Sequence, residues 1–258
     1  MRFTLTGLLV LSVTLLGASL GGVRAAEVSV AVASNFAAPA QRIAKAFEQD
    51  TGHKVLLSLG STGHLYAQIR HGAPYDVLLA ADDETPLKLA QEGLAVPGSR
   101  FTYATGRLAL WSKQAGLVDG QGDVLRIGQF QRLAIAHPRL APYGAAAREV
   151  MVRMGVWSVL RDKVVQGDNI GQAYQFVATE NASLGFVALS QVLQDGKIRE
   201  GSAWIVPSGW HAPLRQDAVW LSRARDHEGA QAWMAYLQSD KIQALIQSLG
   251  YETRVSKR

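Results

Sequence analysis

Four places in the sequence could hold an anion, because a short apolar run is followed there by small, hydroxyl or glycine residues. These places are residues 33–35, 60–63, 141–144 and 167–171. Each has the composition that begins a helix, and a helix N-terminus exposes unpaired N–H groups and the positive end of the helix dipole. Several such ends that converge would bind an oxyanion without lysine or arginine. The hydroxyls of Ser34, Ser61 and Thr62 would add further donors.

The competing interpretation of each turn is local. Ser34 and Ser61 are of a residue type that caps helices, and for any one turn capping is the better explanation. Four turns of this kind in one chain favour anion binding more strongly than one does. The pattern by itself leaves the two interpretations nearly balanced.

Other chemistries have less support. The 6 histidines are scattered and form no His-Glu-x-x-His motif, so we expect no metal cation site and no cofactor. Asp82, Asp83 and Glu84 follow an apolar run and precede Pro86, which favours helix capping or a solvated turn over a cation site or an acid–base pair. An exported hydrolase that uses Asp82 or Asp83 with a histidine is the distant alternative. The sequence has no cysteine, which excludes disulfides, thiolate nucleophiles and iron–sulfur clusters.

Composition points to a folded, exported protein. Of the 258 residues, 48% are hydrophobic and 18% charged, which is enough apolar material for a sizeable core. The net charge of +5 is spread along the chain without a basic patch, and we expect no nucleic-acid partner. Residues 1–25 have the form of a signal peptide: Arg2, an apolar run at 8–16, and the small residues Val23 and Ala25 before the cleavage point.

After the signal, short apolar runs alternate with amphipathic stretches. Strands are predicted at 28–33, 55–59, 76–81, 107–113, 133–136, 184–189, 204–207 and 219–222, with helices between them and a closing pair of helices. This alternation predicts an α/β protein in which each of two lobes is a mostly parallel sheet flanked by helices. We expect lobe one at 27–105 plus 208–258 and lobe two at 106–207, with the ligand in the cleft at the carboxyl ends of the strands.

Together with their flanking residues, the four turns resemble those of a known family. The matching stretches are 30–36, 60–69, 72–77, 80–82, 135–138, 142–144, 169–173 and 184–188, in an order that covers essentially the whole mature chain. The sequence resembles the periplasmic molybdate-binding proteins of bacterial ABC importers, which have the type II periplasmic binding protein fold. The resemblance implies a periplasmic solute-binding protein, not an enzyme, that captures molybdate and also tungstate and delivers it to a membrane permease. We expect it to act as a monomer, and the alternative is the same fold with another small oxyanion such as sulfate.

The family holds a tetrahedral dianion with hydroxyls and main-chain N–H groups alone. Carried over to this sequence, that implies a ligand site made by Ser34 and Asn35, by Ser61 or Thr62, and by the amides of Tyr143 and Ile170. Because only the N–H groups of Tyr143 and Ile170 would take part, their side chains are expected to matter little. Ala188 stands where some members have a tyrosine hydroxyl. Either Asn35 covers that loss or the site is weaker.

Overall fold

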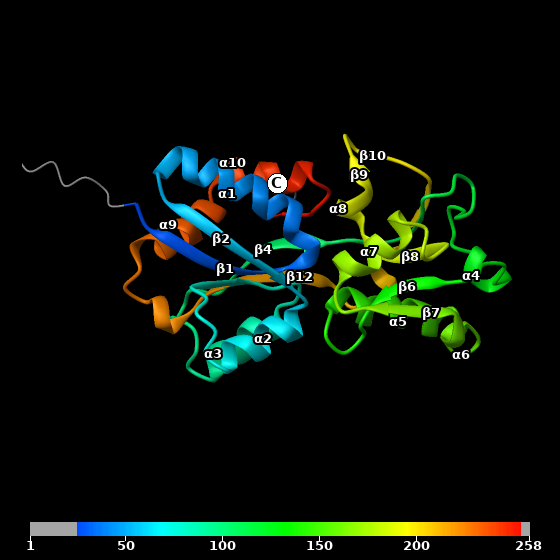
Figure 1. The fold of residues 1–258 in the computed structure, drawn as a ribbon, viewed down its shortest axis with the longest axis horizontal. Helices are drawn as coiled ribbons and strands as arrows, with labels where there is room; N and C mark the ends of the chain where they lie inside the picture. The colour runs from blue at the N-terminus through cyan, green and yellow to red at the C-terminus, as the bar shows by residue number, and fades with distance from the viewer. Residues whose placement is uncertain (1–24, 254–258) are drawn as a thin grey trace, which may run out of the picture.

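The computed structural model describes residues 25–253. The signal predicted at residues 1–25 lies outside this range except for Ala25. The described chain forms two lobes, at the left and right of Figure 1, each built on a five-stranded sheet. In sheet order, the strands of the first lobe are β2 (Lys54–Gly60), β1 (Glu27–Ala33), β3 (Val77–Leu79), β12 (Leu214–Trp220) and β4 (Phe101–Gly106). Those of the second lobe are β11 (Ser202–Ile205), β5 (Leu108–Ser112), β8 (Leu184–Ala188), β6 (Leu133–Ala136) and β7 (Val164–Gly167).

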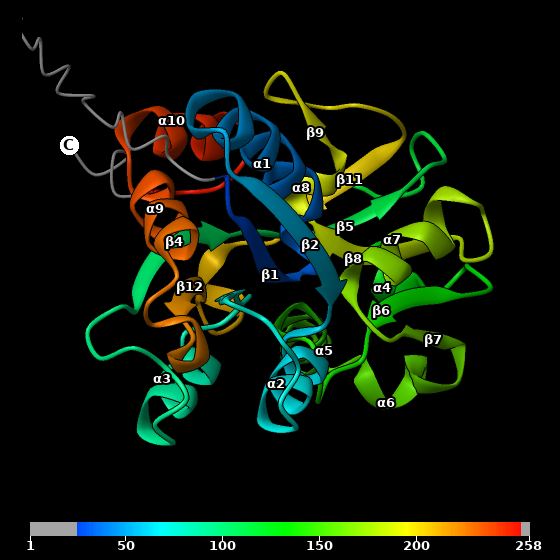
Figure 2. The ribbon, with the colours of Figure 1, turned by 60° about the vertical axis from the view of Figure 1, so that its left-hand side comes forward.

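Helices cover both faces of the first sheet. Side chains alternate between the two faces along β1, and because those of both faces are apolar, both faces are buried under helices. Val30 and Val32 are buried in one cluster with α1 (Ala37–Thr51), α9 (Glu228–Leu237) and α10 (Asp240–Ser248). Ala31 is buried in another cluster with α2 (Thr62–Arg70) and α3 (Glu84–Gln91), which lie below the sheet in Figure 2. Helix α1 ends at Gly52, which adopts the left-handed conformation with φ of 77°.

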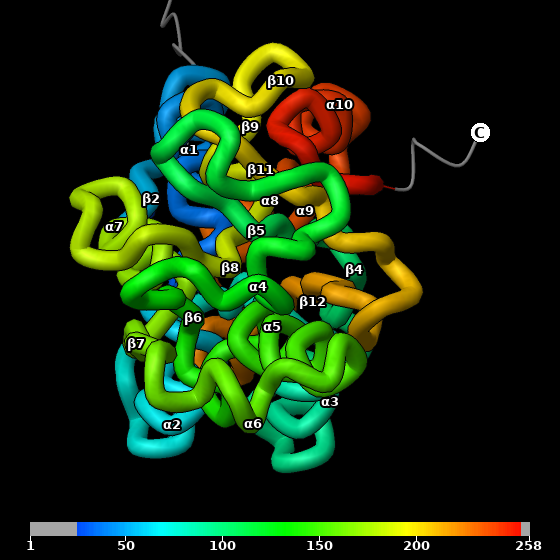
Figure 3. The backbone as a smooth tube through the Cα atoms, turned by 90° about the vertical axis from the view of Figure 1, so that its right-hand side faces the viewer, coloured from blue at the N-terminus to red at the C-terminus, as the bar shows by residue number. Residues whose placement is uncertain are grey.

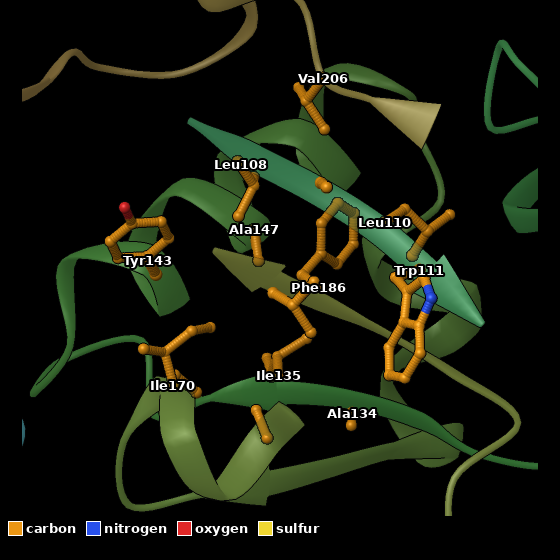
Figure 4. Packing of buried hydrophobic residues seen from close by; sticks show 14 of the residues in the cluster. Leu108, Leu110, Trp111, Ala134, Ile135, Tyr143, Ala147, Ile170, Phe186 and Val206 are labelled. Atoms are coloured by element: carbon orange, nitrogen blue, oxygen red, sulfur yellow. The ribbon is translucent and has the colours of Figure 1, made fainter. Parts of the chain in front are cut away.

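The second lobe has a single apolar core around its sheet. The main helices, α5 (Pro142–Arg153) and α7 (Ile170–Ala178), pack against β5, β6 and β8. Figure 4 shows this packing, with Phe186 and Ile135 inside and Tyr143 and Ile170 at one edge. The smaller elements are α4 (Val124–Ile127), α6 (Trp157–Leu160), α8 (Leu189–Val192) and a hairpin of β9 (Leu193–Gln194) and β10 (Lys197–Ile198). Figure 3 views the molecule from this end, with the second lobe in front.

The chain crosses between the lobes twice, each time between two strands. β4 leads into β5 through Arg107, and residues 206–213 join β11 to β12. The expected two-lobed α/β fold is confirmed, but the sheets are mixed rather than mostly parallel. β1 pairs parallel with β2 and β3, and β6 pairs parallel with β7 and β8, whereas β12 and β5 each make two antiparallel pairings. Strands that carry the chain between lobes therefore supply the antiparallel part.

No helix within residues 25–253 has the length and apolar character needed to cross a membrane.

Candidate functional site

A small cavity lies between the lobes, and all six residues proposed from the sequence line it. Its wall consists of Ala33, Ser34, Asn35, Gly60, Ser61, Thr62, Ala81, Ala141, Pro142, Tyr143 and Ile170. Ser34 and Ser61 directly follow β1 and β2, so the first lobe contributes the carboxyl ends of its strands. The second lobe contributes the beginnings of α5 and α7. None of these described lining residues carries a charge, so any anion held here would be bound by neutral groups.

The helix N-termini supply main-chain donors. Tyr143 is the second residue of α5, which begins with Pro142, and Ile170 is the first residue of α7. At these positions an N–H group has no intrahelical acceptor. Within the part of the chain that the structure describes, neither N–H group has an acceptor elsewhere. Both are therefore available to a bound oxyanion.

The three hydroxyls in the cavity have different surroundings. The Oγ of Ser34 accepts a hydrogen bond of 3.3 Å from the N–H of Gly171 in the other lobe. The Oγ1 of Thr62 accepts one of 3.0 Å from the N–H of Ala81. The Oγ of Ser61 is buried and has no partner among the described residues. Each hydroxyl proton is thus free to be donated, and only Ser61 is without any other bond.

The capping interpretation fails for the two serines. Ser61 is the N-cap residue of α2, yet its side chain makes no capping bond, and Ser34 bonds to a helix of the opposite lobe. Asn169, by contrast, does cap α7, since its Oδ1 accepts from the N–H of Gln172 at 3.1 Å. Neither serine hydroxyl therefore caps the helix that begins at its own turn.

Behind the cavity, Asn35 belongs to a buried polar network. Its Nδ2 donates to Oε1 of Gln216 at 2.9 Å and to the hydroxyl of Tyr251 at 3.3 Å, while its Oδ1 is unpartnered in the described chain. The Nε2 of Gln216 in turn donates to the hydroxyl of Tyr143 at 3.1 Å. Tyr251 donates to the main-chain oxygen of Asn35 at 2.7 Å and accepts from Ser190 at 2.9 Å. Asn35 is thus tied to the second lobe by two routes.

The tyrosines of this network stay protonated. Burial raises the pKa of Tyr251 to about 12. Burial likewise raises the pKa of Tyr143 and of Tyr103, whose hydroxyl bonds to Gln216, well above the usual range. Desolvation opposes the charged form of a phenol. The polar groups behind the cavity are therefore neutral.

This network was not predicted from the sequence. Gln216, Tyr251 and Tyr103 are buried polar residues, and buried polar residues follow no periodic pattern that would mark them. The side chain of Tyr143 also corrects an expectation, because it is only 1% exposed and is hydrogen-bonded. Removing it would disturb the core and the network, not only the packing around a donor.

The competing candidates have structural roles. The carboxylate of Asp82 accepts from the N–H and the hydroxyl of Thr85, in the first turn of α3, at 2.8 and 3.2 Å, whereas Asp83, the N-cap residue of α3, makes no side-chain capping bond. Asp83 forms an ion pair with Arg215. Both residues line a larger cavity of about 500 Å³ beside the site. Within residues 25–253, no group of three His, Asp or Glu side chains is placed to hold a metal ion.

Ala188 lies apart from the cavity wall. It is fully buried at the end of β8, and its N–H donates to Oε1 of Gln191 at 2.9 Å. The Nε2 of Gln191 reaches the main-chain oxygen of Ile170 at 3.4 Å. Gln191 thus connects the end of β8 with the first residue of α7.

Between the two lobes, the hydroxyls of Ser34 and Ser61 and the N–H groups of Tyr143 and Ile170 form a neutral set of donors, which we call the cradle. Two lobes with such a cradle between them define a solute-binding protein for a small anion. The chain belongs to the family of bacterial extracellular solute-binding proteins, whose sequence model matches residues 28–252. It is 55% identical over 228 residues to the molybdate-binding protein ModA of Azotobacter vinelandii, covering 88% of this chain and 90% of that one. It is 47% identical over 229 residues to ModA of Rhodobacter capsulatus, with 89% of each chain covered.

The structural comparison agrees. The solved structure of the periplasmic molybdate-binding protein of Azotobacter vinelandii superposes with a TM-score of 0.85 and 41% identity, covering 87% of this chain and 98% of that one. The sulfate-binding protein SubI of Mycobacterium tuberculosis superposes with a TM-score of 0.70 at 12% identity, covering 90% and 89%, which shows a shared fold. The fold is that of the type II periplasmic binding proteins.

Proposed function

We propose that this protein captures molybdate outside the cytoplasm and delivers it to the membrane permease of an ABC importer. The observation that carries the proposal is the cavity, in which hydroxyls and unpaired N–H groups surround a space without a charged side chain. The identity of 55% to a molybdate-binding protein supplies the choice of anion. The protein binds and releases its ligand and performs no chemistry on it.

In this proposal both lobes donate to the same anion. The first lobe provides the hydroxyls of Ser34 and Ser61, and the second provides the N–H groups of Tyr143 and Ile170. Ser61 is assigned before Thr62 because its buried Oγ has no other partner in the described chain, whereas Thr62 is already held by Ala81. A ligand that bonds to both lobes favours the closed arrangement and shifts the population toward it. The permease would recognise that closed form.

The role of Asn35 is assigned to its main-chain N–H. Its side-chain amide hydrogens already have partners in Gln216 and Tyr251, so the side chain positions the turn after β1. The N–H group lies at the same turn as Ser34, where the short 3₁₀ helix Ser34–Phe36 begins. Asn35 would therefore assist the site through its backbone and through the network behind it.

A cradle made only of hydrogen-bond donors distinguishes anions by whether they carry a proton. At neutral pH molybdate and tungstate are fully deprotonated, whereas phosphate keeps at least one proton that would meet donors instead of an acceptor. An unmatched buried polar group costs about 1–3 kcal/mol, which is roughly ten- to a hundredfold in affinity. We propose that the protein accepts molybdate and tungstate and rejects phosphate.

Isothermal titration calorimetry of the purified mature protein tests this function. Molybdate and tungstate are expected to bind at one site per chain, with sulfate weaker and phosphate at least tenfold weaker than molybdate. Sulfate binding tighter than molybdate would reassign the protein to a sulfate carrier of the same fold. Phosphate within threefold of molybdate would contradict a cradle made of donors only.

We further propose that residues 1–25 direct export to the periplasm and are then removed. The support is the composition of residues 1–25 and the similarity to a periplasmic protein. Intact-mass measurement of the exported protein is expected to find Ala26 within a residue or two of the first position. Retention of Met1 would contradict export by cleavage.

A further inference from the structure

Gln216 is a buried polar residue at the junction of the two lobes. It lies on β12 and is 0% exposed. The pairing of β12 with β4 shifts register between Gln216 and Asp217. Such a bulge turns a strand locally and redirects a side chain. Here the redirected side chain reaches from the first lobe to the second.

The amide of Gln216 joins the two halves of the cradle. Its Oε1 accepts from Nδ2 of Asn35 at 2.9 Å, and its Nε2 donates to the hydroxyl of Tyr143 at 3.1 Å. Asn35 lies beside Ser34 in the half of the cradle that belongs to the first lobe. Tyr143 carries one of the main-chain donors of the other half. The path Asn35, Gln216, Tyr143 therefore runs behind the cavity from one half to the other.

A glycine makes this path possible. Gly106 is the last residue of β4, directly before the chain enters the second lobe. A Cβ atom on Gly106 would lie 2.0 Å from the Tyr143 hydroxyl and 2.5 Å from Nε2 of Gln216. Those distances are far inside van der Waals contact, so a larger residue would push the two groups apart. The absence of a side chain at Gly106 therefore leaves room for the hydrogen bond between Gln216 and Tyr143.

We propose that Gln216 is a positioning residue that fixes the separation of the two halves of the cradle and so sets the size of the oxyanion accepted. The inference rests on the proposed function, because it concerns the same cavity. Molybdate and tungstate have longer bonds to oxygen than sulfate, so their oxygens need a wider cradle. A rigid bridge behind the cavity resists the further closure that a smaller anion requires. Loss of the bridge lets the halves approach and lowers the preference for the larger anion.

The experiment measures the ratio of molybdate affinity to sulfate affinity by calorimetry. Gln216→Leu removes both hydrogen bonds at similar volume, and Tyr143→Phe removes the acceptor while leaving the main-chain N–H in place. Tyr103→Phe is the matched control. It also deletes a buried hydroxyl bonded to Gln216, but Tyr103 lies on β4 and its bonds to Ala80 and Gln216 stay within the first lobe.

Gln216→Leu and Tyr143→Phe are expected to lower the ratio about tenfold, and Tyr103→Phe to leave it within twofold while lowering the melting temperature. A double variant of Gln216 and Tyr143 that is no worse than either single one would show that both act through one bridge. An unchanged ratio in a folded Gln216→Leu protein would overturn the inference. If that variant does not fold, an unchanged ratio in Tyr143→Phe overturns it. A wild-type protein that prefers sulfate would contradict the proposed function instead, while the change in ratio would still test the bridge.

Discussion

Replacement of Ile170 by proline isolates one main-chain donor of the cradle. Ile170 is the first residue of α7, a position where proline is favoured because its missing N–H would have no intrahelical acceptor. Asn169 has φ of −150° and ψ of 172°, an extended conformation that suits the residue before a proline. The bonds from Gly171 to Ser34 and from Gln172 to Asn169 use other N–H groups and are retained. The substitution therefore deletes the donor with little change to the helix.

The expected loss follows from the kind of bond removed. A hydrogen bond to a charged group contributes about 1.5–3 kcal/mol, so Ile170→Pro should weaken molybdate binding about ten- to a hundredfold. Ile170→Val is the matched control, since it trims the side chain by one carbon and keeps the N–H. It should cost about 0.5–1.5 kcal/mol of unfolding free energy and leave affinity within threefold.

Calorimetry gives the affinities, and circular dichroism with thermal melting establishes that both variants are folded. Equal molybdate affinity in a folded Ile170→Pro protein and in the wild type would refute the assignment of this N–H to the ligand. A large loss in Ile170→Val would show that the side chain, not the donor, makes the contribution.

The remaining predictions concern the hydroxyls and an acid beside the site. Ser61→Ala should weaken molybdate binding about tenfold in calorimetry, whereas Thr62→Val should mainly lower the melting temperature because it breaks the hydrogen bond from the N–H of Ala81. A large loss of affinity in Thr62→Val with little loss in Ser61→Ala would instead assign the ligand contact to Thr62. Burial raises the pKa of Asp82 above its ordinary value of 3.8, so its favourable contribution to stability is present below that value and is lost as pH rises through the raised pKa. The melting temperature of Asp82→Asn relative to wild type should therefore be higher at neutral pH than near pH 3.5, and no pH dependence of that difference would contradict the raised pKa.

Regular apolar patterns in the sequence predicted much of the fold. Strand β1 was placed correctly at 28–33 because Val28, Val30 and Val32 follow the period of a strand. Strand β12 was placed at 219–222 but covers Leu214–Trp220, since the polar residues Arg215, Gln216 and Asp217 hide its first half. β4 was missed for a related reason: its threonines and glycine interrupt the apolar run.

The residues of the candidate site were likewise only partly predictable from the sequence. Residues next to strand ends, such as Ser34 and Ser61, could be found because small and hydroxyl residues at a helix start have a local signature. Their convergence on one cavity is a property of the folded chain, and so is the network of Gln216, Tyr251 and Tyr103. A buried polar residue is stabilised by partners far away in the sequence, and Asn35 and Gln216 are separated by 181 positions. No local pattern can contain such a pair.

A crystal structure of the mature protein with molybdate, in which the metal is located by its anomalous scattering, tests the central claim most directly. One molybdenum peak is expected in the cavity between Ser34, Ser61, Tyr143 and Ile170. The oxygens should lie within hydrogen-bond distance of the two hydroxyls and the two N–H groups, and no lysine or arginine should touch them. A peak in the larger cavity beside Arg139 and Arg215, or a direct contact from a charged side chain, would contradict it.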